Sequence, residues 1–423
     1  MELTRAPWTL TGFTIGRWAI TPGSRKDSFD VKPESGGRAE TRRAFIVRGL
    51  AATLATDSLL AGCEYRAHPS GAMPTSFHEV SGPRSLRTHA QRHGLTFGAG
   101  VIIRNVRDDP DFAALIRGQC GIVVPTNELK WIALRPGPGK FEFERPDFLL
   151  TFAQRNHMLL RGHTLCWHES VPDWIKAPNF SGKVRELFAD HITTVCKHYA
   201  GRIHSWDVVN EGILPADGEP HGLRKSFWYE QVGPDYIEFA FRTARAADPH
   251  ARLTYNDYGV EFENPEDAER RRLILELLRN LKLRDVPIDA VGIQSHVRAA
   301  QPNGFGKGLA DYIETIRQMG LEVYLTELDV NEDDILTDDS VARDEIIAHT
   351  YSDFLRVALA NAAVKLVLTW DLSDRFTWLN SGPTHHRKQP NRPQRSLPFD
   401  RDYRTKPAFF SIRDCFDHRT AVA

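Results

Sequence analysis

Two glutamates that follow apolar segments are the residues of this sequence best suited to catalysis. Glu211 ends the run Trp206-Asp207-Val208-Val209-Asn210-Glu211, and Glu327 lies in Thr326-Glu327-Leu328-Asp329. They are 116 residues apart, so only the fold can bring them together. Paired carboxylates fit the hydrolysis of a glycosidic bond, in which one is protonated and the other ionised. The surroundings of the two groups must therefore separate their pKa values.

Polar and aromatic residues at the ends of neighbouring apolar segments fit the same chemistry. Asn210 is placed to hydrogen-bond a sugar hydroxyl, and His296 is placed to hold Glu327 ionised. Trp131 is expected to fill the core. Flat apolar faces suited to stacking on sugar rings are offered by Trp167, Trp370 and Trp378.

Metal and nucleophile chemistry are less well supported. His163, His168 and His296 are candidate metal ligands, but His163 and His168 are five positions apart on an expected strand and should point to opposite faces. Neither HExxH nor GxSxG occurs. Cys166 lies in an apolar segment and is expected to be an inert buried thiol, as are Cys120, Cys196 and Cys415, although an exported chain can hold a disulfide. We expect no metal and no cofactor.

Eight apolar segments alternate with helical patterns and must position these residues. The segments are 97–103, 121–126, 159–167, 203–210, 252–257, 290–296, 323–328 and 365–370. Helical stripes run through Leu273 to Leu281, Ile313 to Met319 and Ile346 to Leu359. This alternation predicts an α/β fold, a single (β/α)8 TIM barrel, with the polar strand ends meeting at one mouth. An open doubly wound sheet would alternate too, but no GxGxxG follows the first segment.

Composition narrows the class further. The chain has 423 residues, a net charge of -1 and 41% hydrophobic residues, so a globular protein without electrostatic affinity for nucleic acid is expected. No apolar run is long enough to span a membrane as a mature segment. The segment around Arg271 and Arg272 is basic and amphipathic, which fits an outer barrel helix better than a membrane-surface helix.

The N-terminal region is predicted to direct export. Arg42 and Arg43 precede a short apolar stretch that ends in Leu60-Ala61-Gly62-Cys63. The order resembles a twin-arginine signal followed by a bacterial lipobox, with Cys63 as the lipidated residue. A poorly packed N-terminal helix is the alternative. We therefore predict an extension at 1–63, a linker at 64–88, a barrel at 89–418, and a periplasmic or cell-surface location, with a lipid anchor.

The barrel segment resembles glycoside hydrolase family 10, the endo-1,4-β-xylanases. Motifs in family order are Gly162-His163-Thr164-Leu165 with Trp167-His168, then the two glutamate motifs, then Leu397-Pro398-Phe399-Asp400. The resemblance implies retaining hydrolysis of xylan or xylo-oligosaccharides, with Glu211 as general acid/base and Glu327 as nucleophile, roughly 5–5.5 Å apart. It implies that Asp329 supports His296. Substrate-binding roles fall on Asn127, Lys130, His163, Trp167, Asn210, Tyr258, Gln294, His296, Trp370 and Trp378, with Asn256 as a further lining residue.

Two departures from the family pattern lie near this site. Thr126 stands where many members have Glu, which removes a sugar-hydroxyl acceptor. Asp371 stands where many have Gly, so a side chain there either crowds the mouth or adds a polar contact. The basic stretch 385–395 follows the last strand; it is either a solvated loop or a site that favours acidic branches such as those of glucuronoxylan.

Three alternatives stay open. They are a related barrel glycosidase acting on another β-1,4-glycan, a non-catalytic sugar-binding barrel, and a surface-anchored structural barrel. The chain is expected to be a monomer.

Overall fold

The strands form a closed parallel barrel. The computed structural model describes residues 75–381, 388, 389 and 391–419. Its strands are β1 (Thr96–Val101), β2 (Ile122–Pro125), β3 (Leu159–His163), β4 (Ser205–Asn210), β5 (Arg252–Asp257), β6 (Ala290–Ile293), β7 (His296–Arg298), β8 (Glu322–Asn331) and β9 (Val364–Trp370). They pair in the order β6-β5-β4-β3-β2-β1-β9-β8, and β6 pairs with β8 to close the ring. The predicted barrel is confirmed.

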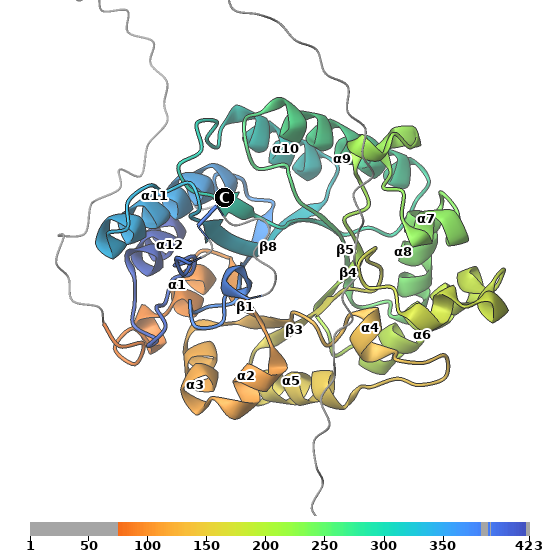
Figure 1. Cartoon of the computed structure of the whole chain (residues 1–423), viewed down its shortest axis with the longest axis horizontal. Coiled ribbons are helices and arrows are strands. Elements are labelled where there is room, and N and C mark those ends of the chain that lie inside the picture. The colour runs from red at the N-terminus through yellow and green to blue at the C-terminus, as the bar shows by residue number, and fades with distance from the viewer. Residues whose placement is uncertain (1–74, 382–387, 390, 420–423) are drawn as a thin grey trace, which may run out of the picture. The chain divides into compact units, whose positions relative to one another are not determined.

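Helices surround the strands, as Figure 1 shows. They are α1 (Leu86–Arg92), α2 (Ile103–Asp108), α3 (Pro110–Gln119), α4 (Trp131–Leu134), α5 (Glu144–Arg155), α6 (Val184–Tyr199), α7 (Phe227–Val232), α8 (Tyr236–Ala247), α9 (Pro265–Leu283), α10 (Lys307–Gln318), α11 (Ser340–Leu359) and α12 (Pro407–Asp417). Short 3-10 helices are η1 (Gly82–Arg84), η2 (Asp173–Lys176), η3 (Pro178–Phe180), η4 (Pro215–Asp217), η5 (Pro220–Gly222) and η6 (Trp378–Asn380).

Helix α9 illustrates how the sequence sets these elements. Asn264 caps it by accepting a hydrogen bond from the Asp267 backbone N–H, and Pro265 occupies its first turn. Its buried stripe includes the predicted Leu273 and Leu281. Arg271 is buried and donates to the backbone carbonyls of residues 260 and 262, so the basic segment is an outer barrel helix.

Several predicted strand boundaries were wrong. The sixth segment breaks between β6 and β7, because Ser295 has a left-handed backbone with φ of 64°. Among the described strands, β7 then pairs with β8 alone, at the mouth. The third strand ends at His163 instead of Trp167, and β8 extends to Asn331. Regular strand alternation therefore cannot be used for the side chains of residues 164–168.

The barrel interior is partly polar beneath the mouth. Arg161 is 1% exposed and donates to the Ser205 and Thr254 hydroxyls, and it pairs with Asp207. The other carboxylate oxygen of Asp207 lies 3.0 Å from His163 Nδ1. A buried charge is tolerated only when paired and hydrogen-bonded, and this network meets that condition. It also fixes the His163 ring from below.

The sequence predicted that the barrel begins at residue 89, but the structure shows that the packed unit begins earlier. Residues 75–88, the end of the expected linker, pack onto the barrel: Phe77 and Leu86 are buried, and the Thr405 backbone N–H donates to the Thr75 carbonyl. The predicted signal and Cys63 lie outside the described residues. Among the described residues, no helix is long and apolar enough to cross a membrane.

Candidate active site

A cavity of about 790 Å³ opens at the carboxyl ends of the strands. Active sites of such barrels lie at this face. Both glutamates line it, as do ten residues predicted to bind substrate: Asn127, Lys130, His163, Trp167, Asn210, Tyr258, Gln294, His296, Trp370 and Trp378. Asn256, predicted as a further lining residue, is instead fully buried and is not part of the lining. Asp329 lies behind the lining. The topology therefore brings together residues spread over 250 positions of sequence.

Glu327 is a buried carboxylate held by two donors. Its side chain is 6% exposed, Asn256 Nδ2 donates to Oε1 at 2.8 Å, and His296 Nε2 lies 3.4 Å from Oε2. Burial alone would raise the pKa of Glu327. The His296 hydrogen bond and the positive charge of the nearby histidines outweigh burial and lower that pKa to about 2. Glu327 is therefore ionised at any pH near neutrality.

His296 is itself held in the charged form. Its Nδ1 lies 3.0 Å from Asp329 Oδ1, and the two acidic neighbours outweigh burial and raise the pKa of His296 well above its usual range. Asp329 Oδ2 accepts a hydrogen bond from Trp378 Nε1 at 2.6 Å. Asp329 thus fixes both the His296 ring and the Trp378 indole.

This arrangement predicts a pH effect for His296→Gln. Without the imidazolium, burial raises the pKa of Glu327, so the acid limb of kcat/KM should move to higher pH while the neutral range changes less. Profiles of kcat/KM from roughly pH 3 to 8 measure this. His250→Gln, at an exposed loop, is the matched control. An acid limb at the same pH in wild type and His296→Gln would contradict the prediction.

Glu211 is more open than Glu327 and is held differently. Its side chain is 12% exposed, and Oε1 accepts from Asn210 Nδ2 at 3.0 Å and Gln294 Nε2 at 2.9 Å. No described residue donates a hydrogen bond to Oε2; the nearest cationic or ring nitrogens belong to His168 at 3.7 Å and Arg224 at 3.9 Å. Oε2 is therefore the oxygen free to carry a proton toward a ligand.

Two asparagine amides join the carboxylates. Asn256 Nδ2 donates both to Glu327 Oε1 and to Asn210 Oδ1, each at 2.8 Å, and Asn210 in turn donates to Glu211. The register explains this chain, because Asn210 pairs with Asn256 across β4 and β5, and Asn256 pairs with Gly292 on β6. A Cβ at Gly292 would lie 2.0 Å from Asn256 Oδ1, so only glycine leaves room for that amide.

The lysine and tryptophan side chains predicted at the site also line the cavity. Lys130 Nζ lies 4.5 Å from the Trp167 ring centroid, and burial lowers the pKa of this lysine. Trp370 is 8% exposed and packs edge-on to His163, whereas Trp378 is 46% exposed. Trp131 packs against Trp228 in the core, as predicted. The Trp378 face is thus the accessible one.

Arg224 is a site residue that the sequence reasoning missed. Its Nε donates to the Glu211 backbone carbonyl at 2.7 Å, and its Nη2 donates to Tyr258 Oη at 3.0 Å. Glu211 has φ of 60°, a left-handed conformation that costs energy outside glycine. Its N–H donates to the Asn256 carbonyl at 2.8 Å. Arg224 and Asn256 therefore hold the strained residue from both sides.

The structure corrects the prediction for His163 and His168 and supports the prediction for Cys166. His163 and His168 were expected to point to opposite faces, but both line the cavity, because β3 ends at His163. Among the described residues, no cluster of three or more His, Cys, Asp or Glu side chains is arranged to hold a metal ion. Cys166 is buried, which raises its pKa well above the usual range, so the inert thiol is supported. Cys120, Cys166 and Cys196 form no disulfide among the described residues, and Cys415 is also buried.

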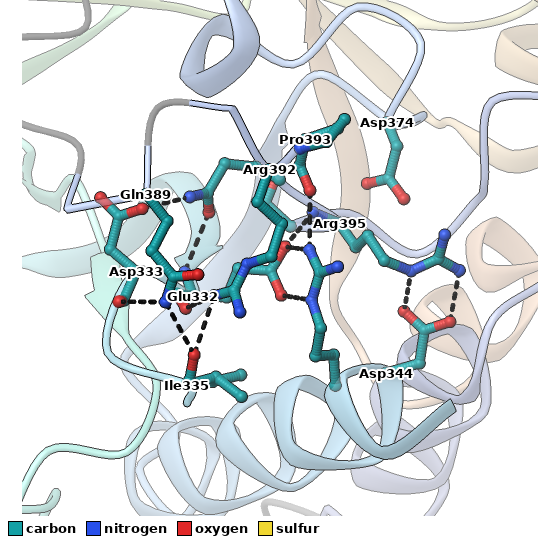
Figure 2. Close-up of polar contacts among 12 residues, drawn as sticks. Glu332, Asp333, Ile335, Asp344, Asp374, Gln389, Arg392, Pro393 and Arg395 are labelled. Atoms are coloured by element: carbon teal, nitrogen blue, oxygen red, sulfur yellow. Dashed lines mark hydrogen bonds and ion pairs between the residues drawn. The ribbon is translucent and has the colours of Figure 1, made fainter. Parts of the chain in front are cut away.

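The described part of the basic stretch is not an open cationic surface, although Lys388 is exposed. Figure 2 shows Arg392 and Arg395 turned inward onto acidic and carbonyl groups. Arg395 Nε donates to Asp344 Oδ1 at 2.8 Å, and Arg392 donates to the backbone carbonyls of Glu332 and Ile335. Lys388 pairs with Asp334. These charges are satisfied internally, so they do not support recognition of acidic branches; His385, His386 and Arg387 lie outside the described residues.

The same network connects this stretch to the cavity. Gln394 and Asn380 exchange hydrogen bonds, from Gln394 N to Asn380 Oδ1 at 2.8 Å and from Asn380 Nδ2 to the Gln394 carbonyl at 3.0 Å. Asn380 ends η6, which begins at Trp378. Gln394 Oε1 also accepts from the Glu332 backbone N–H, just beyond β8. The stretch therefore fixes the segment that carries Trp378.

The fold is a parallel eight-stranded barrel. Its mouth holds two carboxylates, connected by hydrogen bonds through two asparagine side chains, beside tryptophan rings. This fold and site define a barrel glycoside hydrolase. Within that class, the chain belongs to glycosyl hydrolase family 10, whose sequence model matches residues 85–415.

Relatives named as xylanases match most of the barrel. The chain is 31% identical over 329 residues to endo-1,4-beta-xylanase B of Thermotoga neapolitana, covering 77% of this chain and 89% of that protein. It is 33% identical over 328 residues to the beta-1,4-xylanase of Dictyoglomus thermophilum, covering 75% of this chain and 87% of that protein. The crystal structure of xylanase 10B from Thermotoga petrophila with xylobiose superposes with a TM-score of 0.70 at 29% identity, covering 79% of this chain and 97% of that one.

Proposed function

We propose that this protein is an endo-1,4-β-xylanase that cleaves internal β-1,4-xylosidic bonds with retention of configuration. The observation that carries the proposal is the pair Glu211 and Glu327, joined through Asn210 and Asn256 at the barrel mouth. Relatives named as xylanases, and a related structure that holds xylobiose, indicate the sugar.

In the first step, Glu327 attacks the anomeric carbon of the sugar. Its carboxylate is ionised, because His296 lowers its pKa, and Asn256 and His296 aim it. The glycosidic carbon–oxygen bond breaks while Glu211 Oε2 delivers its proton to the leaving oxygen. A covalent glycosyl ester on Glu327 results.

In the second step, the ionised Glu211 takes a proton from water, which attacks the same carbon. The ester bond to Glu327 breaks, and the sugar leaves with its original configuration. Asn210 donates to Glu211 and lines the cavity, so it is placed between this carboxylate and the sugar. Trp378 presents an exposed face for a sugar ring, and Asp329 holds that indole in place.

Release of reducing ends from beechwood xylan by residues 64–423 tests the proposal, with cellulose and mannan as competing substrates. Hydrolysis of xylan well above the other two supports it. Preference for cellulose or mannan would support the related glycosidase instead. Binding of xylo-oligosaccharides without turnover by the folded protein would support the sugar-binding barrel.

We also propose that the chain is exported and anchored through a lipid on Cys63. The order of Arg42, Arg43 and Leu60-Ala61-Gly62-Cys63 supports this, and nothing in the described residues bears on it. Labelled palmitate should enter the full chain in a bacterial host and be lost in Cys63→Ala, with Cys196→Ala as the control. Equal labelling of Cys63→Ala and wild type would contradict the proposal. The monomeric state stays a prediction.

A further inference from the structure

Asp371 is a buried carboxyl group that the mechanism above does not use. It directly follows Trp370, the last residue of β9, and it lines the same cavity as the two glutamates. Only 3% of the residue is exposed, yet no described residue hydrogen-bonds its Oδ1. An unsatisfied buried polar atom is costly, and such a group in a native fold calls for a partner.

The backbone at this position makes the side chain still less expected. Asp371 has φ of 74°, in the left-handed region that glycine adopts without cost. Many family members carry glycine there. The chain thus tolerates two unfavourable features, a left-handed aspartate and a buried unpaired oxygen, at one position of the active-site wall. Strained residues of this kind cluster at ligand sites.

The register places Asp371 at the rim, beside the sugar-stacking wall. β9 pairs with β1 at Gly100 and Trp370 and with β8 at Leu328 and Thr369. Asp371 therefore comes one residue past the last pair, with the ends of β1 and β8 on either side. Trp370 and Asp371 line the same cavity, so a sugar ring in contact with the Trp370 indole would lie next to the Asp371 side chain.

We propose that Asp371 is a specificity-determining residue that hydrogen-bonds a ring hydroxyl of the sugar lying against Trp370. The inference rests on the proposed function, because it assumes that sugar in this cavity. A hydroxyl of a neutral sugar both donates and accepts, so it can pair with the Asp371 carboxyl group without adding charge.

The electrostatic surroundings fit a neutral partner. Burial, and then the carboxylate of Asp329, raise the pKa of Asp371 well above its usual range. Both effects favour the uncharged acid, a form that can donate as well as accept a hydrogen bond. A ring hydroxyl matches both capacities.

Two substitutions and a matched control test the inference. Asp371→Gly removes the side chain and relieves the backbone, and Asp371→Asn keeps a donor and an acceptor. Asp285→Gly is the control, because Asp285 is also left-handed, with φ of 51°, but is exposed beyond α9 and away from the cavity. Steady-state kinetics on xylotetraose and thermal unfolding are measured for all four proteins.

Asp371→Gly should raise KM about tenfold with kcat nearly unchanged, while its Tm equals or exceeds that of wild type. Asp371→Asn should stay within about threefold of the wild-type KM. Asp285→Gly should share any gain in Tm and leave KM alone. A loss of binding together with a gain in stability cannot come from a merely structural role.

An unchanged or lower KM in Asp371→Gly would overturn the inference, since the aspartate would then be only a tolerated departure from glycine. Failure of wild type to cleave xylotetraose is a different result and would count against the proposed function. In that case, calorimetry measures the binding of xylotetraose, cellotetraose and mannotetraose to wild type and to Asp371→Gly. The inference holds if the glycine variant binds at least one of these sugars about tenfold more weakly than wild type. It fails if all affinities are equal or if no sugar is bound.

Discussion

Glu327→Ala should lower kcat on xylan by at least about 10⁴-fold, because the variant has no group that can form the covalent intermediate. Glu327 is the carboxylate whose pKa is lowered to about 2, and it is fixed by both Asn256 and His296. Loss of reducing-sugar release in a protein with unchanged far-UV circular dichroism is the expected result. Glu266→Gln, in the exposed first turn of α9, should keep wild-type turnover.

Added azide distinguishes a missing nucleophile from a damaged fold. The small anion fits where the Glu327 carboxylate was and can attack the anomeric carbon directly, while Glu211 still protonates the leaving oxygen. One displacement inverts the carbon, so the product should be an α-glycosyl azide, identified by nuclear magnetic resonance. Residual activity above about 1% of wild type without azide would contradict the assignment of Glu327 as the nucleophile.

The sequence predicts the barrel and the carboxylate pair for one physical reason. Parallel strands of a closed barrel end at the same face, so polar residues after successive apolar runs must meet there. This holds for Glu211, which follows β4, and for His296 and Glu327, which lie at the ends of the sixth and seventh apolar segments. No distance between them was needed for the prediction.

Features that depend on local backbone geometry or on remote partners could not be read from the sequence. The break at Ser295 depends on a left-handed residue that is not glycine, so no turn signal marks it. Arg224 acts on a backbone carbonyl, which carries no side-chain pattern. The pairing of Lys388 and Arg395 was not foreseen, because their acidic partners, Asp334 and Asp344, lie about fifty positions away.

Asp371 combines one feature that the sequence shows with others that only the structure shows. Its departure from the family's glycine is visible in the sequence, and it leaves open whether the side chain obstructs or contacts a ligand. Burial, the left-handed backbone and the unsatisfied Oδ1 narrow that choice. Thr126, the other departure from the family pattern, is buried, whereas its neighbour Asn127 is exposed. The Thr126 Oγ1 accepts a hydrogen bond from Asn127 Nδ2 at 3.4 Å. Asn127 is therefore the residue of this pair that a ligand can reach.

Glu211→Ala should separate the two steps of the reaction. On xylan, whose leaving group is a sugar alkoxide that must be protonated, kcat should fall by about 10²- to 10⁴-fold. On 2,4-dinitrophenyl β-xylobioside the phenolate leaves without a proton, so the first step should stay fast. Deglycosylation lacks its general base and becomes limiting, so a burst of dinitrophenolate equal to the enzyme concentration should precede slow turnover.

The position of Glu211 makes this outcome specific. Its Oε1 is held by Asn210 and Gln294, so the side chain is aimed, and only Oε2 is free to exchange the proton. Glu230→Gln, exposed on α7, is the matched control and should show neither effect. Equal losses of kcat/KM on xylan and on the activated substrate, without a burst, would mean that Glu211 only binds or positions the sugar. A burst on the activated substrate would assign proton transfer to Glu211, because loss of a binding contact slows the first step with both leaving groups.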